Sequence, residues 1–296
     1  MTSPGSRLCR ETSGQQDLYV TQLADLVSDG IVSEYPSSGG SAINAQNFPI
    51  TGLRGPAGLA ISGNNLYVAN QANLPTGDDP KGTIKGTVGL YNANSGKAIN
   101  AQFITGLSKP TGLAVAGNTL YVSSFIPNGT VSAYTANTGA PAPGFTTIPG
   151  LSQPTGLAVA GGILYVASFG TNIMKGGVIG TYNANSGEAI NPTLITQLSG
   201  PSGVIVTGGT LFVSNEFGGT IGEYTVSGDG KNAIPTGSIT TGMTGPSGLA
   251  LASKGTLLFV ANTLTGTVSA YDISAGGGAN IISGLTGPAG LAIKNQ

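Results

Sequence analysis

The sequence of 296 residues contains no histidine, no tryptophan and a single cysteine. Without histidine it cannot form a Ser-His-Asp triad, an imidazole base or a His-ligated zinc site. One cysteine, Cys9, excludes disulfides within the chain, thiolate clusters and iron–sulfur sites. No metal site built from histidine or cysteine is therefore expected.

Charge is also scarce. Charged residues make up 8% of the chain, against about 25% in an ordinary globular domain. The 11 Lys and Arg nearly balance the 12 Asp and Glu, so there is no basic surface for phosphates and no nucleic-acid partner is expected. No apolar run approaches the roughly 18 residues that span a bilayer, and no secretion signal is visible, so membrane insertion is not expected.

Glycine, by contrast, is abundant, with 50 residues, and it accompanies an internal repeat. The segment GPAGLAI at 55–61 returns five times, as KPTGLAV (109–115), QPTGLAV (153–159), GPSGVIV (200–206), GPSGLAL (245–251) and GPAGLAI (287–293). The period of about 45 residues is typical of a four-stranded propeller blade.

Each copy leads into the same series of short strands. Runs such as LYVAN (66–70) come next, then runs such as GTVGLY (86–91), and then a looser strand such as AINAQFI (98–104). These β-branched and aromatic runs are bounded by Gly, Asn and Pro and show no helical periodicity. The unit therefore has four strands.

The two ends of the chain predict how the ring closes. DLYVTQ (17–22), IVSEY (31–35) and INAQNF (43–48) are strands two to four of a unit that lacks strand one, and GPAGLAI at 287–293 is a strand one alone. The sequence therefore predicts an all-β, six-bladed β-propeller over residues 17–296, in which the C-terminal strand completes the N-terminal blade and leaves no open sheet edge. Residues 1–16 share no pattern with the repeat and are expected to be a disordered leader.

The repeat also predicts core positions. The tyrosines fall on second and third strands, with Phe212 and Phe259 in the remaining second-strand places, and we expect them to pack between blades. The glycine of each P-x-G motif is expected where the innermost strands crowd the axis, or where the backbone needs a positive φ. Glu34 and Glu223, on third strands, are expected to face solvent or an inter-blade rim.

The pattern P-x-G-L-A-V, L-Y-V-A-N and G-T-V-x-x-Y resembles the NHL-type six-bladed β-propeller, in particular its Gly-, Asn- and Thr-rich bacterial members. The resemblance covers about residues 17–296 and implies the fold and a secreted or periplasmic location. The wider family includes lyases, lactonases, RNA binders and protein-interaction platforms. Its peptide-amidating and streptogramin-cleaving lyases depend on histidine, which this chain lacks.

Calcium-dependent lactonases of the gluconolactonase and paraoxonase type are more distantly similar. The resemblance implies a metal-binding Asn in P-N-G-L, but this position holds neutral residues without an amide: Ala57, Thr111, Thr155, Ser202, Ser247 and Ala289. Because calcium takes six to eight oxygen ligands, including carboxylates, the resemblance does not carry the usual site. A weakly bound channel calcium stays open as an alternative.

Polar residues follow strand two in every blade: Gln22, Asn70, Ser124, Ser168, Asn215 and Asn262. The turns into strand one, with Thr111 and Thr155, open on the same end of a propeller. A ring of neutral hydrogen-bonding groups is therefore predicted around the channel mouth. It either satisfies exposed backbone and holds water, or contributes to a ligand site.

The loops after strand two break the repeat in blades three to five. Phe125, Phe169 and Phe217 stand there, with Glu216 as the acidic residue at that level, while Met174 and Lys175 occupy a lengthened loop. We hypothesise an apolar-walled pocket with one carboxylate, in which Glu216 has a raised pKa and serves as acid or base and Lys175 assists. An insertion at 73–85 could cover it as a lid. The alternative is a solvated Glu216 and phenylalanines that cap blade edges.

These observations predict a monomeric propeller that binds a small molecule or another protein at the channel mouth. An ester, lactone or phosphotriester hydrolase, or a lyase, working through Glu216 is the second hypothesis. A surface adhesion module that binds by its broad faces is the third. Whether the protein is an enzyme is left open at this stage.

Overall fold

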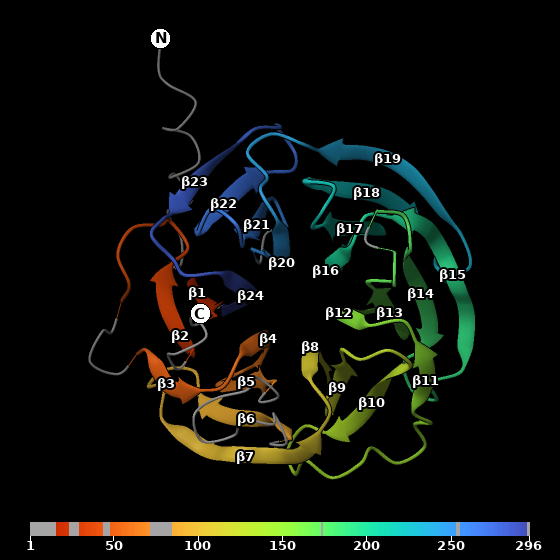
Figure 1. Cartoon of the computed structure of the whole chain (residues 1–296), viewed down its shortest axis with the longest axis horizontal. Helices are drawn as coiled ribbons and strands as arrows, with labels where there is room; N and C mark the ends of the chain where they lie inside the picture. The colour runs from red at the N-terminus through yellow and green to blue at the C-terminus, as the bar shows by residue number, and fades with distance from the viewer. Residues whose placement is uncertain are drawn as a thin grey trace.

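The computed structural model describes residues 16–23, 30–43, 48–71, 85–172, 174–252 and 255–294. These residues form six four-stranded antiparallel sheets, arranged as blades around a central axis (Figure 1), and no helix occurs among them. The predicted six-bladed propeller is confirmed. Residues 1–15 of the predicted leader lie outside the described residues.

Blades 2 to 6 each use four consecutive strands, from the axis outward. Their bounds are as follows: blade 2, β4 (Pro56–Ser62), β5 (Asn65–Asn70), β6 (Gly86–Asn92) and β7 (Ala98–Leu107); blade 3, β8 (Pro110–Ala116), β9 (Thr119–Ser124), β10 (Gly129–Thr135) and β11 (Ile148–Leu151); blade 4, β12 (Pro154–Ala160), β13 (Ile163–Ser168), β14 (Gly177–Asn183) and β15 (Ala189–Leu198); blade 5, β16 (Pro201–Thr207), β17 (Thr210–Asn215), β18 (Thr220–Val226) and β19 (Ala233–Ile239); blade 6, β20 (Pro246–Leu251), β21 (Leu257–Asn262), β22 (Thr267–Asp272) and β23 (Gly278–Ile282).

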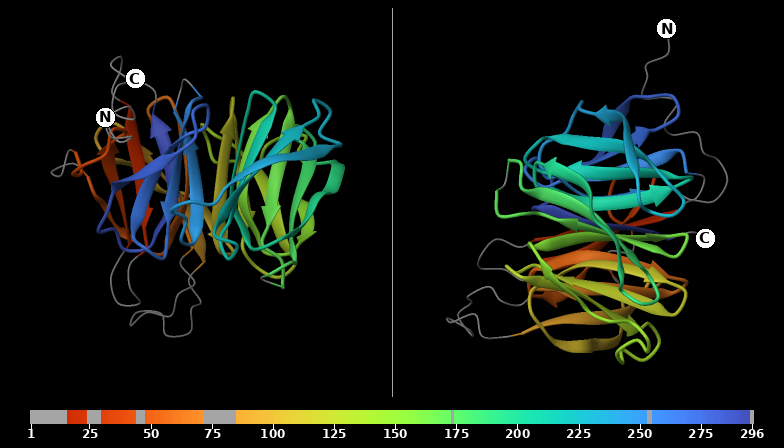
Figure 2. Two further views of the ribbon diagram at one scale, coloured as in Figure 1. Left: turned by 90° about the horizontal axis from the view of Figure 1, so that it is seen from above. Right: turned by 90° about the vertical axis from the view of Figure 1, so that its right-hand side faces the viewer.

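Blade 1 closes the ring. It combines β1 (Asp17–Gln22), β2 (Gly30–Pro36) and β3 (Ile50–Leu53) with β24 (Pro288–Lys294), which is the innermost strand. β24 pairs antiparallel with β1, placing Leu18 opposite Ile293 and Val20 opposite Leu291. The predicted completion of the N-terminal blade by the C-terminal strand is therefore confirmed, and the closed disc is seen from its side in Figure 2.

The innermost strands approach one another through the glycines of the P-x-G motif. A methyl group on Gly112 would lie 1.9 Å from the carbonyl oxygen of Thr155 in the next blade, and one on Gly290 would lie 2.1 Å from that of Ala57. These glycines have no positive φ. Close approach of neighbouring backbones, rather than a left-handed conformation, is therefore why glycine is required there.

Hydroxyl groups link these inner strands in alternate blades. Ser123 Oγ accepts a hydrogen bond from Gly112 N at 2.7 Å and donates one to Thr155 O at 2.7 Å. Thr21 and Ser214 bridge blades 1 to 2 and 5 to 6 in the same way. The other blades carry alanine at this strand-two position: Ala69, Ala167 and Ala261. The axis therefore alternates between two kinds of inter-blade contact.

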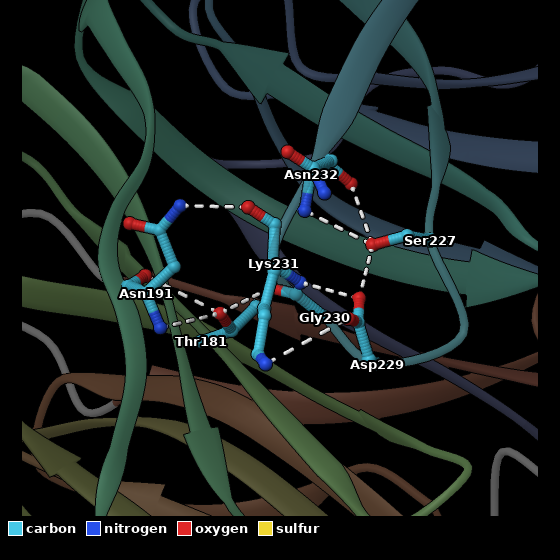
Figure 3. Close-up of polar contacts among 7 residues, drawn as sticks. All are labelled: Thr181, Asn191, Ser227, Asp229, Gly230, Lys231 and Asn232. Atoms are coloured by element: carbon cyan, nitrogen blue, oxygen red, sulfur yellow. Dashed lines mark hydrogen bonds and ion pairs between the residues drawn. The ribbon is translucent and has the colours of Figure 1, made fainter.

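Aromatic side chains fill the space between blades, as predicted. Tyr19, Tyr67 and Tyr121 are buried, and their hydroxyls donate to carbonyl oxygens of the following blade at 2.7–2.9 Å. The contact between blades 4 and 5 differs, because Thr181 Oγ1 donates to Gly230 O at 2.7 Å (Figure 3). Asn191 Nδ2 donates to Lys231 O beside it at 2.9 Å. Each blade is thus fixed to its neighbour by packing and by directed hydrogen bonds.

Glu34 does not face solvent. Its side chain is 2% exposed, at the contact between blades 1 and 2, where Tyr19 Oη lies 3.2 Å from Glu34 Oε1. Burial, and then the charge of Glu34, raise the pKa of Tyr19. Glu34 was expected to face either solvent or an inter-blade rim, and in the structure it lies between blades 1 and 2.

Candidate functional site

One face of the disc combines the turns into the innermost strands with the loops between the second and third strands. We call it the mouth face. The residue before each motif proline has a left-handed backbone, with φ between 44° and 64°. Its carbonyl accepts the N–H of the first residue after strand two, and these six mouth positions are Leu23, Gln71, Phe125, Phe169, Glu216 and Thr263. One backbone frame is thus repeated six times with different side chains.

The predicted polar ring is largely buried in this frame. Asn70, Ser124, Ser168, Asn215 and Asn262 are all buried. The amides of Asn215 and Asn262 donate to Thr220 and Thr267 at the start of the third strand, each at 3.3 Å. These groups therefore join strands two and three. Asn70 Oδ1 and Asn215 Oδ1, however, are buried and have no hydrogen-bond partner among the residues that the structure describes.

The central channel is narrow and neutral. Its cavity has a volume of about 120 Å³ and is lined by the x, G and L or V residues of the six motifs. Thr111 and Thr155 line it, whereas the other predicted ligand-binding residues do not. Thr155 Oγ1 donates to Pro201 O of the next blade at 2.9 Å and to Ala167 O at 3.3 Å, so part of this lining is committed to the fold.

The three phenylalanines of blades 3 to 5 form a continuous row. The ring centroids of Phe125 and Phe169 are 5.7 Å apart with an interplanar angle of 80°, and those of Phe169 and Phe217 are 5.4 Å apart at 71°. Such edge-to-face pairs are favourable. The structure therefore brings together the three aromatic residues that the sequence singled out.

The apolar surface extends beyond this row. Phe217 is 47% exposed, Met174 is 59% exposed and Leu264 is 75% exposed, and all three lie in loops after strand two. The other two exposed large apolar side chains in the described part of the chain are Ile99 and Ile234, on outer strands β7 and β19. We call Phe125, Phe169, Met174, Phe217 and Leu264 the apolar arc.

Leu264 was not among the predicted site residues. The signal was available, because Leu264 stands two residues after Asn262 just as Phe217 stands two residues after Asn215. In the structure the Leu264 side chain lies beside the turn into β20, where a methyl group on Gly245 would be 2.8 Å from Leu264 Cγ.

Glu216 lies within this arc and is partly buried. Its backbone N–H donates to Gly200 O at 2.9 Å. Burial alone raises the pKa of the Glu216 carboxyl. Lys175 is exposed and forms no ion pair with Glu216 in the described part of the chain. Residues 73–84 of the predicted lid lie outside the described residues.

The described ranges contain no cluster of three or more His, Cys, Asp or Glu side chains placed to hold a metal ion. They also contain no helix that is long and apolar enough to cross a membrane.

A second hollow of about 390 Å³ lies on the outer rim between blades 3 and 4, where Thr147, Tyr182 and Glu188 contribute to its walls. Two of its polar side chains, Glu188 and Thr147, contact other side chains of the protein. Ser186 Oγ donates to Glu188 Oε2 at 3.3 Å, and the hydroxyls of Ser132 and Thr147 are 3.3 Å apart.

Comparison with known proteins agrees with the fold. The family described as "Lactonase, 7-bladed beta-propeller" matches residues 163–284, from β13 to the end of blade 6, which is less than half of the chain. No curated protein sequence matches.

Two solved structures illustrate the structural similarity. One chain, from "Crystal structure of Nidogen/Laminin Complex", has a TM-score of 0.70 and 14% identity over 94% of this chain and 98% of that one. A functionally unknown protein from Desulfotomaculum acetoxidans DSM 771 has a TM-score of 0.59 and 13% identity over 93% and 98%. At these identities the similarity shows a shared fold.

Proposed function

We propose that this protein is a binding propeller that holds a protein partner on its mouth face. The observation that carries the proposal is the apolar arc, in which four consecutive blades present apolar side chains in the loops after strand two, on one face. Exposed apolar patches mark interaction surfaces, and aromatic residues are enriched at the cores of interfaces. The chain is otherwise low in exposed large apolar side chains over its described residues.

The channel supports a protein partner over a small molecule enclosed at the axis. Ligand pockets usually have volumes of about 300–1,000 Å³, and the channel cavity is about 120 Å³. The apolar arc, in contrast, lies on an open surface. The similar chain from the nidogen–laminin complex is an example of this fold in a protein assembly and supports the proposal.

A displayed random-peptide library tests the proposal. Immobilised wild-type protein is used for selection, and each enriched peptide is then measured against two variants. Phe217→Ser with Leu264→Ser removes the exposed part of the arc, whereas Ile99→Ser with Ile234→Ser removes the same kind of surface from the rim.

We expect enriched peptides to bind the wild-type protein and the rim variant equally and to lose at least about tenfold in affinity for the arc variant. A tenfold loss of affinity corresponds to about 1.4 kcal/mol. Burying the Phe217 and Leu264 side chains against a peptide should contribute more than this to the free energy of binding. Equal binding to all three proteins, or no enrichment, would refute the proposal. Circular dichroism of both variants checks that they are folded.

A hydrolase of the ester or lactone type is the second candidate. It is favoured by the match of 163–284 to a lactonase family, a range that contains Glu216. A partly buried carboxyl with a raised pKa suits general acid–base catalysis. Hydrolysis of activated esters, lactones and phosphotriesters, with and without a chelator, tests it. Activity that survives Glu216→Gln unchanged would rule out the role of this residue.

A further inference from the structure

The hollow on the outer rim between blades 3 and 4 is separate from the mouth face, and we call it the rim hollow. Its volume of about 390 Å³ falls within the range of about 300–1,000 Å³ that is usual for small-ligand pockets. Ile148 and Pro149 of β11 line it from blade 3, and Ala189 and Pro192 of β15 line it from blade 4 (Figure 1). The rim hollow is therefore large enough, and apolar enough, to hold a small organic molecule.

The turn of blade 4 beside the rim hollow is fixed against blade 3. Thr146 N donates to Ser186 O at 2.8 Å, and a methyl group on Gly187 would lie 2.1 Å from Thr146 O. Within the turn, Gly187 N donates to Asn183 O and Asn183 N donates to Glu188 O, each at 2.8 Å. The backbone that carries Glu188 is thus held in place before a ligand binds, which lowers the ordering cost of binding.

Tyr182 contributes a buried polar group to the rim hollow. Its side chain is 5% exposed, and its hydroxyl has no hydrogen-bond partner among the described residues. The ring folds over Gly180, where a methyl group would lie 3.1 Å from Tyr182 Oη and 2.9 Å from Pro192 O. The hydroxyl is therefore directed toward β15, beside a residue that lines the rim hollow. A buried hydroxyl without a partner is unfavourable, so a ligand that bonds it would be favoured.

Glu188 is the charged residue among those that line the rim hollow. Its side chain is exposed, and Ser186 Oγ donates to Glu188 Oε2 at 3.3 Å. No lysine or arginine pairs with this carboxylate in the described part of the chain. The rim hollow thus combines apolar walls, an aromatic hydroxyl and one carboxylate that has no cationic partner.

We propose that the rim hollow binds a small organic cation, with its ammonium or guanidinium group at Glu188 and its apolar body between β11 and β15. Such a group carries several hydrogen-bond donors and no acceptor, and its hydrogen bonds to a carboxylate are charge-assisted. The Tyr182 hydroxyl contributes a further hydrogen bond to a ligand that fills the hollow. A free amine and a lysine or arginine side chain of another protein present this same chemistry.

Blade 2 contains a matched turn of opposite charge. Its sequence YNANSGKAIN differs from YNANSGEAIN of blade 4 at one position, where Lys97 replaces Glu188. In both turns the carbonyl of the charged residue accepts the N–H of the asparagine five residues before it, at 2.8 Å. Because this turn accommodates either charge, we expect Glu188→Lys to fold normally.

Three probes test the proposal. Benzylamine carries a phenyl ring and an ammonium group, benzyl alcohol carries the same ring with a neutral hydroxyl, and N-acetyl-lysine N-methylamide represents a lysine side chain of a protein. Each is titrated into isotope-labelled full-length protein and followed by NMR shifts. The proteins are the wild type, Glu188→Lys and Tyr182→Phe, with Lys97→Glu and Tyr91→Phe as matched controls in blade 2. Tyr91 is also buried, and its hydroxyl also has no hydrogen-bond partner among the described residues.

We expect the wild-type protein to bind benzylamine about two- to fivefold more tightly than benzyl alcohol, the factor that corresponds to an ion pair near the surface. Glu188→Lys should remove this preference. Tyr182→Phe should weaken the binding of both aromatic probes about threefold or more, because a neutral hydrogen bond is lost. Lys97→Glu and Tyr91→Phe should bind both as the wild type does, and circular dichroism checks that all four variants are folded.

The inference is overturned if the wild-type protein binds neither aromatic probe or does not prefer the amine, or if Glu188→Lys keeps the preference. It is also overturned if Tyr182→Phe binds as the wild type does, or if the blade 2 controls change the affinities as much as the blade 4 variants do. Tighter binding of the lysine derivative than of benzylamine indicates a protein side chain as the ligand, and the opposite order indicates a free amine. The peptide selection concerns the mouth face, so its failure and the failure of this inference are independent.

Discussion

Replacing Ser123 by alanine tests how the axis is held together. The Ser123 hydroxyl is buried between blades 3 and 4 and makes two short hydrogen bonds, from Gly112 N and to Thr155 O, both of 2.7 Å. Each contributes about 1 kcal/mol net. Removing the hydroxyl also leaves the Gly112 N–H without this acceptor, which costs a further 1–3 kcal/mol or so. We expect Ser123→Ala to lower the free energy of unfolding by about 3–5 kcal/mol.

This is a large effect on a protein whose total stability is expected to be about 5–15 kcal/mol. Equilibrium unfolding in urea, followed by circular dichroism, measures it, and the dependence on urea concentration should stay the same. Ser132→Ala is the matched control, because the Ser132 hydroxyl contacts the side chains of Thr147, at 3.3 Å, and Tyr134, and bridges no pair of innermost strands. The control should change stability by less than about 0.5 kcal/mol. If the two variants lose the same stability, the hydroxyl bridge does not hold the blades.

Three further predictions concern single positions. Ala57→Thr should raise the free energy of unfolding by about 1 kcal/mol, since blade 2 lacks the hydroxyl with which Thr155 bonds the next blade; a lower melting temperature would contradict it. Burial raises the pKa of Glu216, so ionisation of this carboxyl destabilises the folded state. The free energy of unfolding of the wild type, relative to that of Glu216→Gln, should therefore fall as pH rises from about 4 through the raised pKa. Parallel plots of the two free energies against pH would refute this. Lys109 has a φ of 44° and occupies a position that is glycine in four blades. Lys109→Gly should therefore leave the free energy of unfolding unchanged or raise it by up to about 1 kcal/mol in urea unfolding. A decrease in the free energy of unfolding by more than about 1 kcal/mol would be evidence against backbone strain at this residue.

The fold could be predicted because each repeat begins with the same recognisable motif. Six P-x-G motifs at one period predict the blade count, and an N-terminal unit without strand one predicts the closure by β24. The contact between Phe125 and Phe169 followed for the same reason, since equal positions in consecutive blades are neighbours in space. Phe217 stands one residue later in its own loop, and the structure shows that it still contacts Phe169. In a regular repeat, the spacing of residues along the sequence therefore predicts which of them lie close together in space.

Other features required coordinates. Alternation along the third strand did not reveal that Glu34 is buried, because both faces of a blade pack on neighbours and either side of the strand can be covered. The polar groups after strand two could be located from the sequence, but not the direction of their amides. Their orientation toward the third strand depends on the turn after Asn215 and Asn262. The width of the channel likewise depends on how closely the glycines approach.

The way in which β24 completes blade 1 has a consequence for synthesis of the chain. Blades 2 to 6 are built from consecutive hairpins and can form as each segment leaves the ribosome. β1 must wait for the last strand before its inner edge is paired. Until then that edge can accept another strand, including one from a second nascent chain. The same pairing that seals the finished ring is therefore the step at which its assembly is most exposed to error.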